Sequence, residues 1–314
     1  MGLVKSAACI GGGVIGGAWV ARFALAGIDV KIFDPHPESQ RIIGEVMANA
    51  ERAYAMLTMA PLPPKGRLTF CRSLAEAVAE ADWIQESVPE RLELKRGILT
   101  EIDAAARPDA LIGSSTSGLL PTDLQAQMKH PERMFVAHPY NPVYLLPLVE
   151  LVGGKATSAE TIGHAKRGAE QIGMKGVVIA KEIEAFVGDR LLEALWREAL
   201  WLVHDDICDT ETLDDVIRYS FGLRWAQMGL FETYRIAGGE AGMRHFLAQL
   251  SGTAPRCTVQ PKQAPPYAAT ERAIDGLNLS KMPTKSSRRS CPAGRSHQPA
   301  SVNAFLNARG ASTR

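Results

Sequence analysis

A histidine and a glutamate twelve residues apart have the types and spacing expected of a general base and the acid that orients it. His138 lies in the segment Ala137–Pro142, and Glu150 lies inside the apolar run Leu148–Val152. Imidazole is the side chain whose unperturbed pKa is nearest neutrality, so it can take a proton from an alcohol. An unpaired carboxylate in an apolar run would be costly, which favours a partnership with His138. Alternatively, a single histidine after a strand is often structural, and Glu150 could be a surface charge.

A glycine-rich turn near the start of the chain predicts a dinucleotide site. Residues 10–16 read IGGGVIG, which satisfies G-x-G-x-x-G. Gly11 permits the tight turn, Gly13 lets backbone approach a pyrophosphate, and Gly16 allows the next helix to pack on the sheet. Val14 and Ile15 complete the loop, and a helix N-terminus then faces the phosphates. A glycine turn that merely joins a strand to a helix is the alternative.

Asp34, eighteen residues after Gly16, bears on which dinucleotide binds. It ends a second apolar run, Val30–Phe33, where a carboxylate can accept hydrogen bonds from the adenosine ribose. The extra phosphate of NADP would be repelled there, and Arg41 is the obvious neutraliser in the nearby sequence. The predicted cofactor is NAD, unless Asp34 is only a surface cap.

Ser117 adds a third polar side chain to the predicted chemistry. It belongs to the run Ser114–Ser117, which follows an apolar run, and it precedes His138 by twenty-one residues. Hydride transfer from an alcohol carbon to nicotinamide needs a base for the hydroxyl proton, and His138 can supply it. Serine and threonine runs also commonly cap helices, so Ser117 has a second interpretation.

The elements that position these residues read as a doubly wound α/β sheet of Rossmann type over residues 1–181. Short apolar runs alternate with helix-length segments, which predicts a parallel sheet with crossover helices. The runs are Ala7–Ile10, Val30–Phe33, Trp83–Gln85, Ala110–Ile112, Met134–Ala137 and Val177–Ile179. Ser117 and His138 then follow strands, at the carboxyl edge where such sheets bind ligands.

The pattern of apolar residues changes after residue 181. Apolar residues at helical spacing predict helices over 184–204, 210–219 and 243–250, so we expect an all-helical domain over residues 182–250. Residues 251–314 carry ten Lys and Arg against two acidic residues, with many prolines, and are predicted to be a disordered basic tail.

Composition excludes several classes of protein. At 46% hydrophobic and 22% charged residues the chain is typical of a globular enzyme, and no apolar run is long enough to cross a membrane. The part before the tail is mildly acidic, which argues against nucleic acid as a partner. Five scattered cysteines suit neither a disulfide framework nor a zinc site, so we expect no metal and a cytoplasmic location.

The glycine loop with Ser117, His138 and Glu150 resembles the 3-hydroxyacyl-CoA dehydrogenase family over roughly residues 3–250. The resemblance implies that Ser117 binds the substrate oxygen, that His138 is the base and that Glu150 holds it. It also implies that Glu90 and Lys95 lie near the nicotinamide end of the cofactor, and that the helical domain builds a homodimer.

The chain departs from the family pattern at a position that bears on the chemistry. Residues 185–192 read AFVGDRLL where the family usually has G-F-x-x-N-R-L-L, so Asp189 replaces an asparagine that would help to polarise the substrate carbonyl. A carboxylate there would repel a thioester oxygen or an anion and could favour a cation. An Asp beside Arg190 near a helix start is also often only a dipole partner.

Two further features favour a small substrate. The stretch 38–67 holds few basic residues for a CoA phosphate. The helical part is rich in aromatic residues, whose faces bind quaternary ammonium groups, and its segments resemble the branch of the family that oxidises L-carnitine. The resemblance implies a substrate site among Trp196, Trp201, Arg224, Trp225, Phe231 and Tyr234. A helical core and dimer interface is the alternative for the aromatic residues.

Other functions stay open from sequence alone. 3-Hydroxybutyryl-CoA and L-gulonate are alternative substrates within the family, and a non-catalytic NAD-binding protein like the related lens crystallins is an alternative of another class. The change of texture near Gln249 suggests that the helical domain is incomplete and that the end is frameshifted or otherwise altered.

Overall fold

The computed structural model describes residues 4–57 and 61–242 and divides into two units, residues 1–190 and 191–314. The predicted helix 243–250, the predicted tail and the altered end lie outside the described residues.

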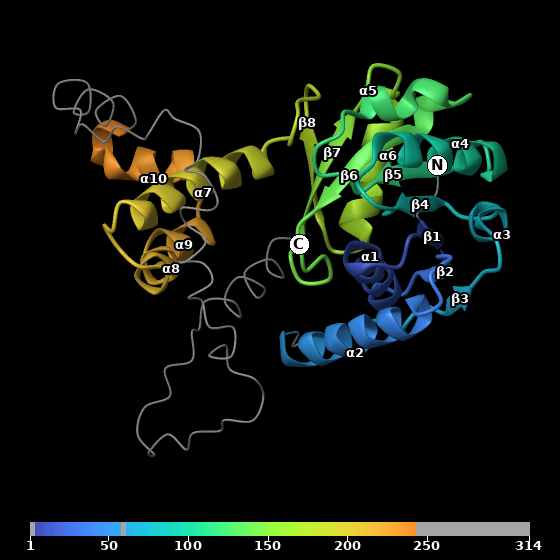
Figure 1. The fold of residues 1–314 in the computed structure, drawn as a ribbon, viewed down its shortest axis with the longest axis horizontal. Coiled ribbons are helices and arrows are strands. Elements are labelled where there is room, and N and C mark those ends of the chain that lie inside the picture. Colours follow the sequence, from blue (N-terminus) through green and yellow to red (C-terminus); the bar gives the residue numbers. More distant parts are fainter. Residues whose placement is uncertain (1–3, 58–60, 243–314) are drawn as a thin grey trace, which may run out of the picture. The chain divides into compact units, whose positions relative to one another are not determined.

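The first unit contains an eight-stranded sheet in the order β3-β2-β1-β4-β5-β6-β7-β8 (Figure 1). Its strands are β1 Ser6–Ile10, β2 Asp29–Phe33, β3 Leu68–Phe70, β4 Trp83–Glu86, β5 Leu111–Ser114, β6 Met134–Pro139, β7 Leu148–Gly153 and β8 Lys175–Ile179. Neighbouring strands pair in parallel except β6 and β7, which are antiparallel. The predicted fold class is confirmed. The predicted parallel sheet has one antiparallel pair, because an eight-residue loop, and no crossover helix, connects β6 directly to β7.

Helices cover both faces of this sheet. They are α1 Val14–Leu25, α2 Ser39–Leu57, α3 Leu74–Val78, α4 Leu92–Ala105, α5 Pro121–Leu124 and α6 Ala159–Gln171, with short 3₁₀ turns at Gln125–Gln127 and Pro131–Arg133. Helices α1, α2 and α6 pack on one buried cluster, and α3, α4 and α5 pack on another. Strand β1 contributes Ala7 and Cys9 to the first cluster and Ala8 and Ile10 to the second, as the alternation of side chains along a strand requires.

An aromatic group fixes α1, the helix that follows the glycine loop, against the sheet. The rings of Trp19 and Phe23 on α1 lie 6.4 and 6.0 Å from the ring of Trp83 on β4. Trp19 donates from Nε1 to Ser115 Oγ at 3.1 Å, so the same side chain ties α1 to the Ser/Thr segment after β5. The loop and that segment are therefore held in a fixed relation.

The second unit is helical in its described part. Helix α7 Gly188–His204 leads into it and is followed by α8 Thr210–Tyr219, α9 Phe221–Trp225, α10 Leu230–Ala237 and a 3₁₀ turn at Gly239–Ala241. The prediction of one helix over 184–204 is wrong at its start, because Ala185 and Phe186 have φ of 58° and 47°, outside the right-handed helical region. Within 191–242, Leu200 is the one large hydrophobic residue that is buried.

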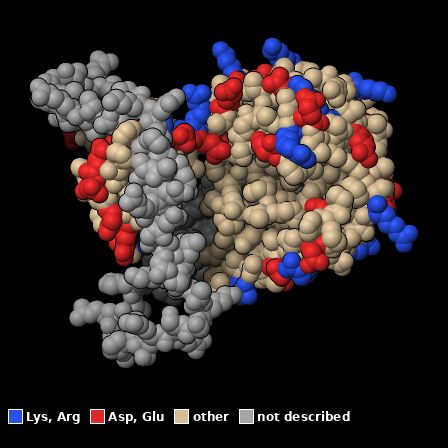
Figure 2. All heavy atoms as spheres, in the orientation of Figure 1, with Lys and Arg blue, Asp and Glu red and all other residues tan. Residues whose placement is uncertain are grey.

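The surface of the first unit carries both signs of charge. On the face drawn in Figure 2, basic and acidic side chains are interspersed around a broad uncharged area. No helix in the described part of the chain has the length and apolar character needed to cross a bilayer.

Candidate active site

The antiparallel pairing of β6 and β7 places His138 directly opposite Glu150. Directly opposed residues of an antiparallel pair have their side chains on the same face, so the two groups meet. His138 Nδ1 lies 2.9 Å from Glu150 Oε2, and both residues are 3% exposed. The missed strand β7 is thus the element that creates the predicted pair.

Glu150 accepts hydrogen bonds from three further donors. Tyr140 donates from its hydroxyl to Oε2 at 2.9 Å, and the backbone N–H groups of Val187 and Gly188 donate to Oε1 at 3.1 and 3.0 Å. Burial alone raises the pKa of Glu150, but the hydrogen bonds from His138, Tyr140 and Gly188 outweigh it and hold that pKa below its ordinary value. Glu150 is therefore kept as a carboxylate.

Gly188 is required where α7 begins against this carboxylate. A Cβ at this position would lie 1.4 Å from the hydroxyl of Tyr140. Any side chain would displace Tyr140 from Glu150. Burial, and then the neighbouring Glu150 charge, raise the pKa of the Tyr140 hydroxyl well above its usual value, so it stays a donor.

The other nitrogen of His138 faces a second carboxylate. Asp189 Oδ2 lies 3.5 Å from Nε2, and the Asp189 side chain is 31% exposed. The rings of Tyr140 and Phe186 lie 5.2 and 5.3 Å from the imidazole and fix its plane. Because the carboxylate of Glu150 accepts a hydrogen bond from the protonated Nδ1, Nε2 is the nitrogen left to accept a proton from a substrate.

The glycine loop lies between β1 and α1 beside a cavity of about 620 Å³ that Asp34 also lines. Gly11 has a φ of +94°, and a Cβ there would lie 2.7 Å from the carbonyl oxygen of Ser87, so glycine is required. A Cβ at Gly13 would meet nothing within 4 Å, which leaves its backbone open to a ligand. Val14 and Ile15 at the start of α1 line the same cavity, which has the size of a small-molecule site.

Asp34 also accepts backbone hydrogen bonds that the sequence did not predict. Its Oδ2 accepts the backbone N–H of Gly12, and its Oδ1 accepts that of His36 at 2.7 Å. The carboxylate thus braces the glycine loop while it lines the cavity. This arrangement fits a bound dinucleotide, with the phosphates at the N-terminus of α1 and a ribose at Asp34.

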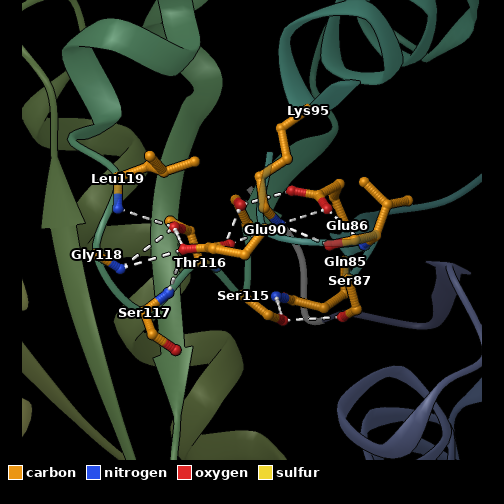
Figure 3. A network of polar contacts seen from close by, with 12 residues as sticks. Gln85, Glu86, Ser87, Glu90, Lys95, Ser115, Thr116, Ser117, Gly118 and Leu119 are labelled. Atoms are coloured by element: carbon orange, nitrogen blue, oxygen red, sulfur yellow. Dashed lines mark hydrogen bonds and ion pairs between the residues drawn. The ribbon is translucent and has the colours of Figure 1, made fainter. Parts of the chain in front are cut away.

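A second cavity of about 190 Å³ continues from the first, sharing Ile15, Ser87 and Val88 with it. It is also lined by Glu90, Lys95, Ser115 and Ser117. Ser117 is exposed, and its hydroxyl points away from Glu90 (Figure 3). It does not cap α5, whose N-cap is Leu120, so the capping interpretation is wrong for that helix.

Lys95 is buried beneath this cavity, at 1% exposure, in a network of charged and polar groups (Figure 3). Its Nζ lies 2.9 Å from Glu86 Oε1, 3.0 Å from the carbonyl oxygen of Val88 and 3.4 Å from Glu90 Oε2. Glu86, fully buried, also accepts the Ser114 hydroxyl at 2.6 Å. Sequence reasoning missed Glu86, although a glutamate directly after the apolar run Trp83–Gln85 was the available signal.

The predicted substrate residues of the helical part all lie in the second unit. The rings of Phe221 and Trp225 are 4.6 Å apart, and those of Trp201 and His204 are 5.2 Å apart. Large exposed fractions are seen at Trp196, Trp225, Phe231 and Tyr234, and Arg224 is exposed as well. Among the described residues, no three His, Cys, Asp or Glu side chains are grouped so as to hold a metal ion.

Comparison with known families gives a match over most of the chain. Residues 6–183 match the model of the 3-hydroxyacyl-CoA dehydrogenase NAD binding domain, and residues 186–271 match that family's C-terminal domain. The chain belongs to the 3-hydroxyacyl-CoA dehydrogenase family. Its first unit is accordingly the NAD-binding part.

Similar proteins include several named for carnitine. The chain is 86% identical over 249 residues to an L-carnitine dehydrogenase/betainyl-CoA thioesterase of Rhizobium sp, covering 79% of this chain and 50% of that protein. It is 65% identical over 250 residues to an L-carnitine dehydrogenase of Mesorhizobium japonicum, and that match covers 79% of this chain and 69% of that protein. The chain spans about half the length of the first of these relatives.

Among solved structures, one of the most similar is 5-formyl-3-hydroxy-2-methylpyridine 4-carboxylic acid 5-dehydrogenase, described as an NAD⁺-dependent dismutase. It is 28% identical, with a TM-score of 0.77, and the match covers 98% of this chain and 95% of that one. The likeness supports the same two-part architecture.

Proposed function

We propose that the chain oxidises the 3-hydroxyl of L-carnitine to 3-dehydrocarnitine with NAD⁺. The observation that carries this proposal is the line Glu150–His138–Asp189, in which a buried imidazole has a carboxylate on each side. The identity of 86% and 65% to proteins named L-carnitine dehydrogenase supports the same substrate.

The proposed proton transfer uses only groups of this chain. His138 Nε2 accepts the hydroxyl proton, and the imidazolium that forms is stabilised by Glu150 at Nδ1. Ser117 donates a hydrogen bond to the substrate oxygen as it becomes a carbonyl. NAD⁺, when bound, supplies the acceptor for the hydride that leaves the carbinol carbon. Gly11–Gly16, Asp34, Glu90 and Lys95 would hold it.

Asp189 is the residue that favours a cationic substrate. In L-carnitine the hydroxyl oxygen and the quaternary nitrogen are separated by only two carbons, so a hydroxyl at His138 Nε2 brings the ammonium close to the Asp189 carboxylate. The same carboxylate disfavours the thioester of 3-hydroxybutyryl-CoA and the anionic L-gulonate. A non-catalytic, crystallin-like role is disfavoured because His138 has a buried carboxylate at Nδ1 that would stabilise its protonated form.

The helical unit supplies the remaining parts of the proposal. The exposed aromatic residues of this unit are of the type that binds a trimethylammonium group, and Arg224 is of the type that pairs with a carboxylate. Exposed apolar side chains such as Phe231, at 80%, also support a homodimer formed through this unit. We also propose domain limits near residues 181 and 250 and a cytoplasmic location.

Turnover by the purified chain tests the proposal. NADH formation is measured with L-carnitine, D-carnitine, 3-hydroxybutyryl-CoA and L-gulonate as substrates. We expect NADH with L-carnitine and at least a hundredfold lower kcat/KM with the others, on the order of what lost polar contacts cost. Turnover of the thioester alone would contradict the assignment.

A further inference from the structure

The second cavity has one charged side chain that is both accessible and fixed. Glu90 and Lys95 are its charged lining residues, and they differ in exposure. The Lys95 side chain is 1% exposed, whereas that of Glu90 is 46% exposed. A ligand in this cavity therefore meets the Glu90 carboxylate more directly than the Lys95 ammonium.

The charges below the cavity do not cancel. Lys95 forms a buried pair with Glu86 at 2.9 Å, and Glu90 lies farther from the same ammonium, at 3.4 Å. The carboxylates of Glu86 and Glu90 thus share one ammonium (Figure 3). Because Glu86 lies closer to Lys95, the uncompensated negative charge is assigned to Glu90. Interactions between charges are stronger in such a partly buried place than in water.

Glu90 cannot turn this charge away from the cavity. Its Oε1 accepts the backbone N–H groups of Ser117 and Gly118 at 3.1 and 3.3 Å and also the hydroxyl of Thr116. Its Oε2 faces Lys95. Both oxygens are held, so the carboxylate has its orientation before any ligand arrives.

The reacting end of the dinucleotide belongs in this cavity under the proposed function. Asp34 lies in the first cavity, the glycine loop follows it, and the second cavity adjoins through Ile15, Ser87 and Val88. Ser117, the proposed partner of the substrate oxygen, also lines the second cavity. A dinucleotide with its ribose at Asp34 extends in this direction.

We infer that Glu90 makes the site discriminate between the two redox states of the cofactor, favouring the oxidised one. The nicotinamide ring is positively charged in NAD⁺ and neutral in NADH, so a fixed carboxylate attracts the first and has little effect on the second. This inference rests on the proposed use of NAD. Its consequence is that the free enzyme loads the oxidant needed for alcohol oxidation.

Dissociation constants without substrate test the inference on the full chain. NADH binding is followed by its fluorescence and NAD⁺ binding by calorimetry, for the wild type and for Glu90→Gln. We expect the neutral variant to bind NAD⁺ about tenfold more weakly and NADH within about twofold of the wild type. A glutamine at position 90 can still accept hydrogen bonds from the N–H groups of Ser117 and Gly118. If Glu90→Gln does not fold, Glu90→Ala is measured in its place, with the same expected result.

Two controls separate charge from structure. Thr116→Val removes one donor to Glu90 but keeps the charge of Glu90, its bonds from the N–H groups of Ser117 and Gly118 and its pairing with Lys95. The ratio of the NAD⁺ and NADH dissociation constants should therefore stay at the wild-type value. Glu93→Gln removes an exposed carboxylate of the neighbouring helix α4 that pairs with Arg96, and it should change neither constant. Equal weakening of both cofactors by Glu90→Gln, or an unchanged ratio, would overturn the inference. Failure of the wild type to bind either cofactor would instead overturn the proposed function.

Discussion

Two buried glutamates of the first unit, Glu150 and Glu86, are stabilised in different ways. Glu86 has a permanent cation, since Lys95 lies 2.9 Å away and is itself buried. Glu150 forms no ion pair with a lysine or arginine of the described residues; an imidazole, a phenol and two backbone N–H groups satisfy it. The net charge around Glu86 is therefore fixed, whereas the net charge around Glu150 changes when His138 gains or loses a proton.

The different partners of Glu86 and Glu150 suit different roles in the site. A carboxylate paired with lysine keeps the same surroundings through a reaction cycle, which suits a group that holds a cavity wall. A carboxylate bonded to a titratable imidazole gains a full counter-charge when that imidazole takes a proton. Glu150 is thus placed to stabilise the product of proton transfer, and Glu86 is placed to keep Lys95 and Glu90 in position.

The largest expected effect is at the lysine pair. Lys95→Met leaves the Glu86 carboxylate buried without its ammonium, and we expect the free energy of unfolding to fall by about 4 kcal/mol. Urea unfolding measures it. The double variant Glu86→Leu with Lys95→Met removes both charges and should recover most of the loss. A double variant as unstable as the single one would contradict the view that pairing is what matters there.

Replacing the base has a comparable effect on rate. His138→Gln keeps a hydrogen-bond donor for Glu150 but cannot accept the substrate proton, so kcat with L-carnitine should fall about a thousandfold. The dissociation constant of NADH should stay within about twofold. His130→Gln, at an exposed histidine of the same unit, is the control and should behave as the wild type. A loss of NADH binding equal to the loss of rate would point to a structural role.

Asp189→Asn has a smaller effect that depends on the substrate. We expect kcat/KM for L-carnitine to fall about tenfold, because an attraction between the carboxylate and the quaternary ammonium is lost. The matched probe is an analogue with a quaternary carbon in place of the nitrogen, for which the variant should lose little. Equal losses with both compounds would show that Asp189 acts on His138 and not on the cation.

The smallest expected effect is a pH dependence of stability that comes from Glu150. The pKa of Glu150 is held below its ordinary value, so its ionised form stabilises the fold fully above the unfolded pKa, about 4.5, and less as pH falls through the folded pKa. The difference in unfolding free energy between the wild type and Glu150→Gln should therefore be largest above about pH 5 and shrink on acidification. A difference that grows as the pH is lowered would contradict the assigned sign.

Local signals in the sequence predict the residue types of the site but not all of their neighbours. The spacing of His138 and Glu150, with Glu150 inside an apolar run, is enough to indicate the pair. Strand β7 is harder to recognise, because a short apolar run does not tell its direction or its partner. The position of Glu86 directly after an apolar run is only a weak signal, because its partner Lys95 belongs to another element and the pairing is not visible locally.

The start of the long helix shows the same limit. Helical spacing extends back to Glu184, but Ala185 and Phe186 adopt positive φ and α7 begins only at Gly188. The N–H groups that this start presents are those that bond Glu150. Tertiary contact decides the boundary, and no local propensity encodes it.

A double-mutant cycle on His138 and Glu150 tests the central claim most directly. The kcat for L-carnitine is measured for His138→Gln, for Glu150→Gln and for the two combined. Because Glu150 is proposed to act through the imidazole, we predict that the combined variant is no slower than His138→Gln alone. Losses that multiply, each variant lowering kcat by its own full factor, would contradict a base held by its neighbouring acid.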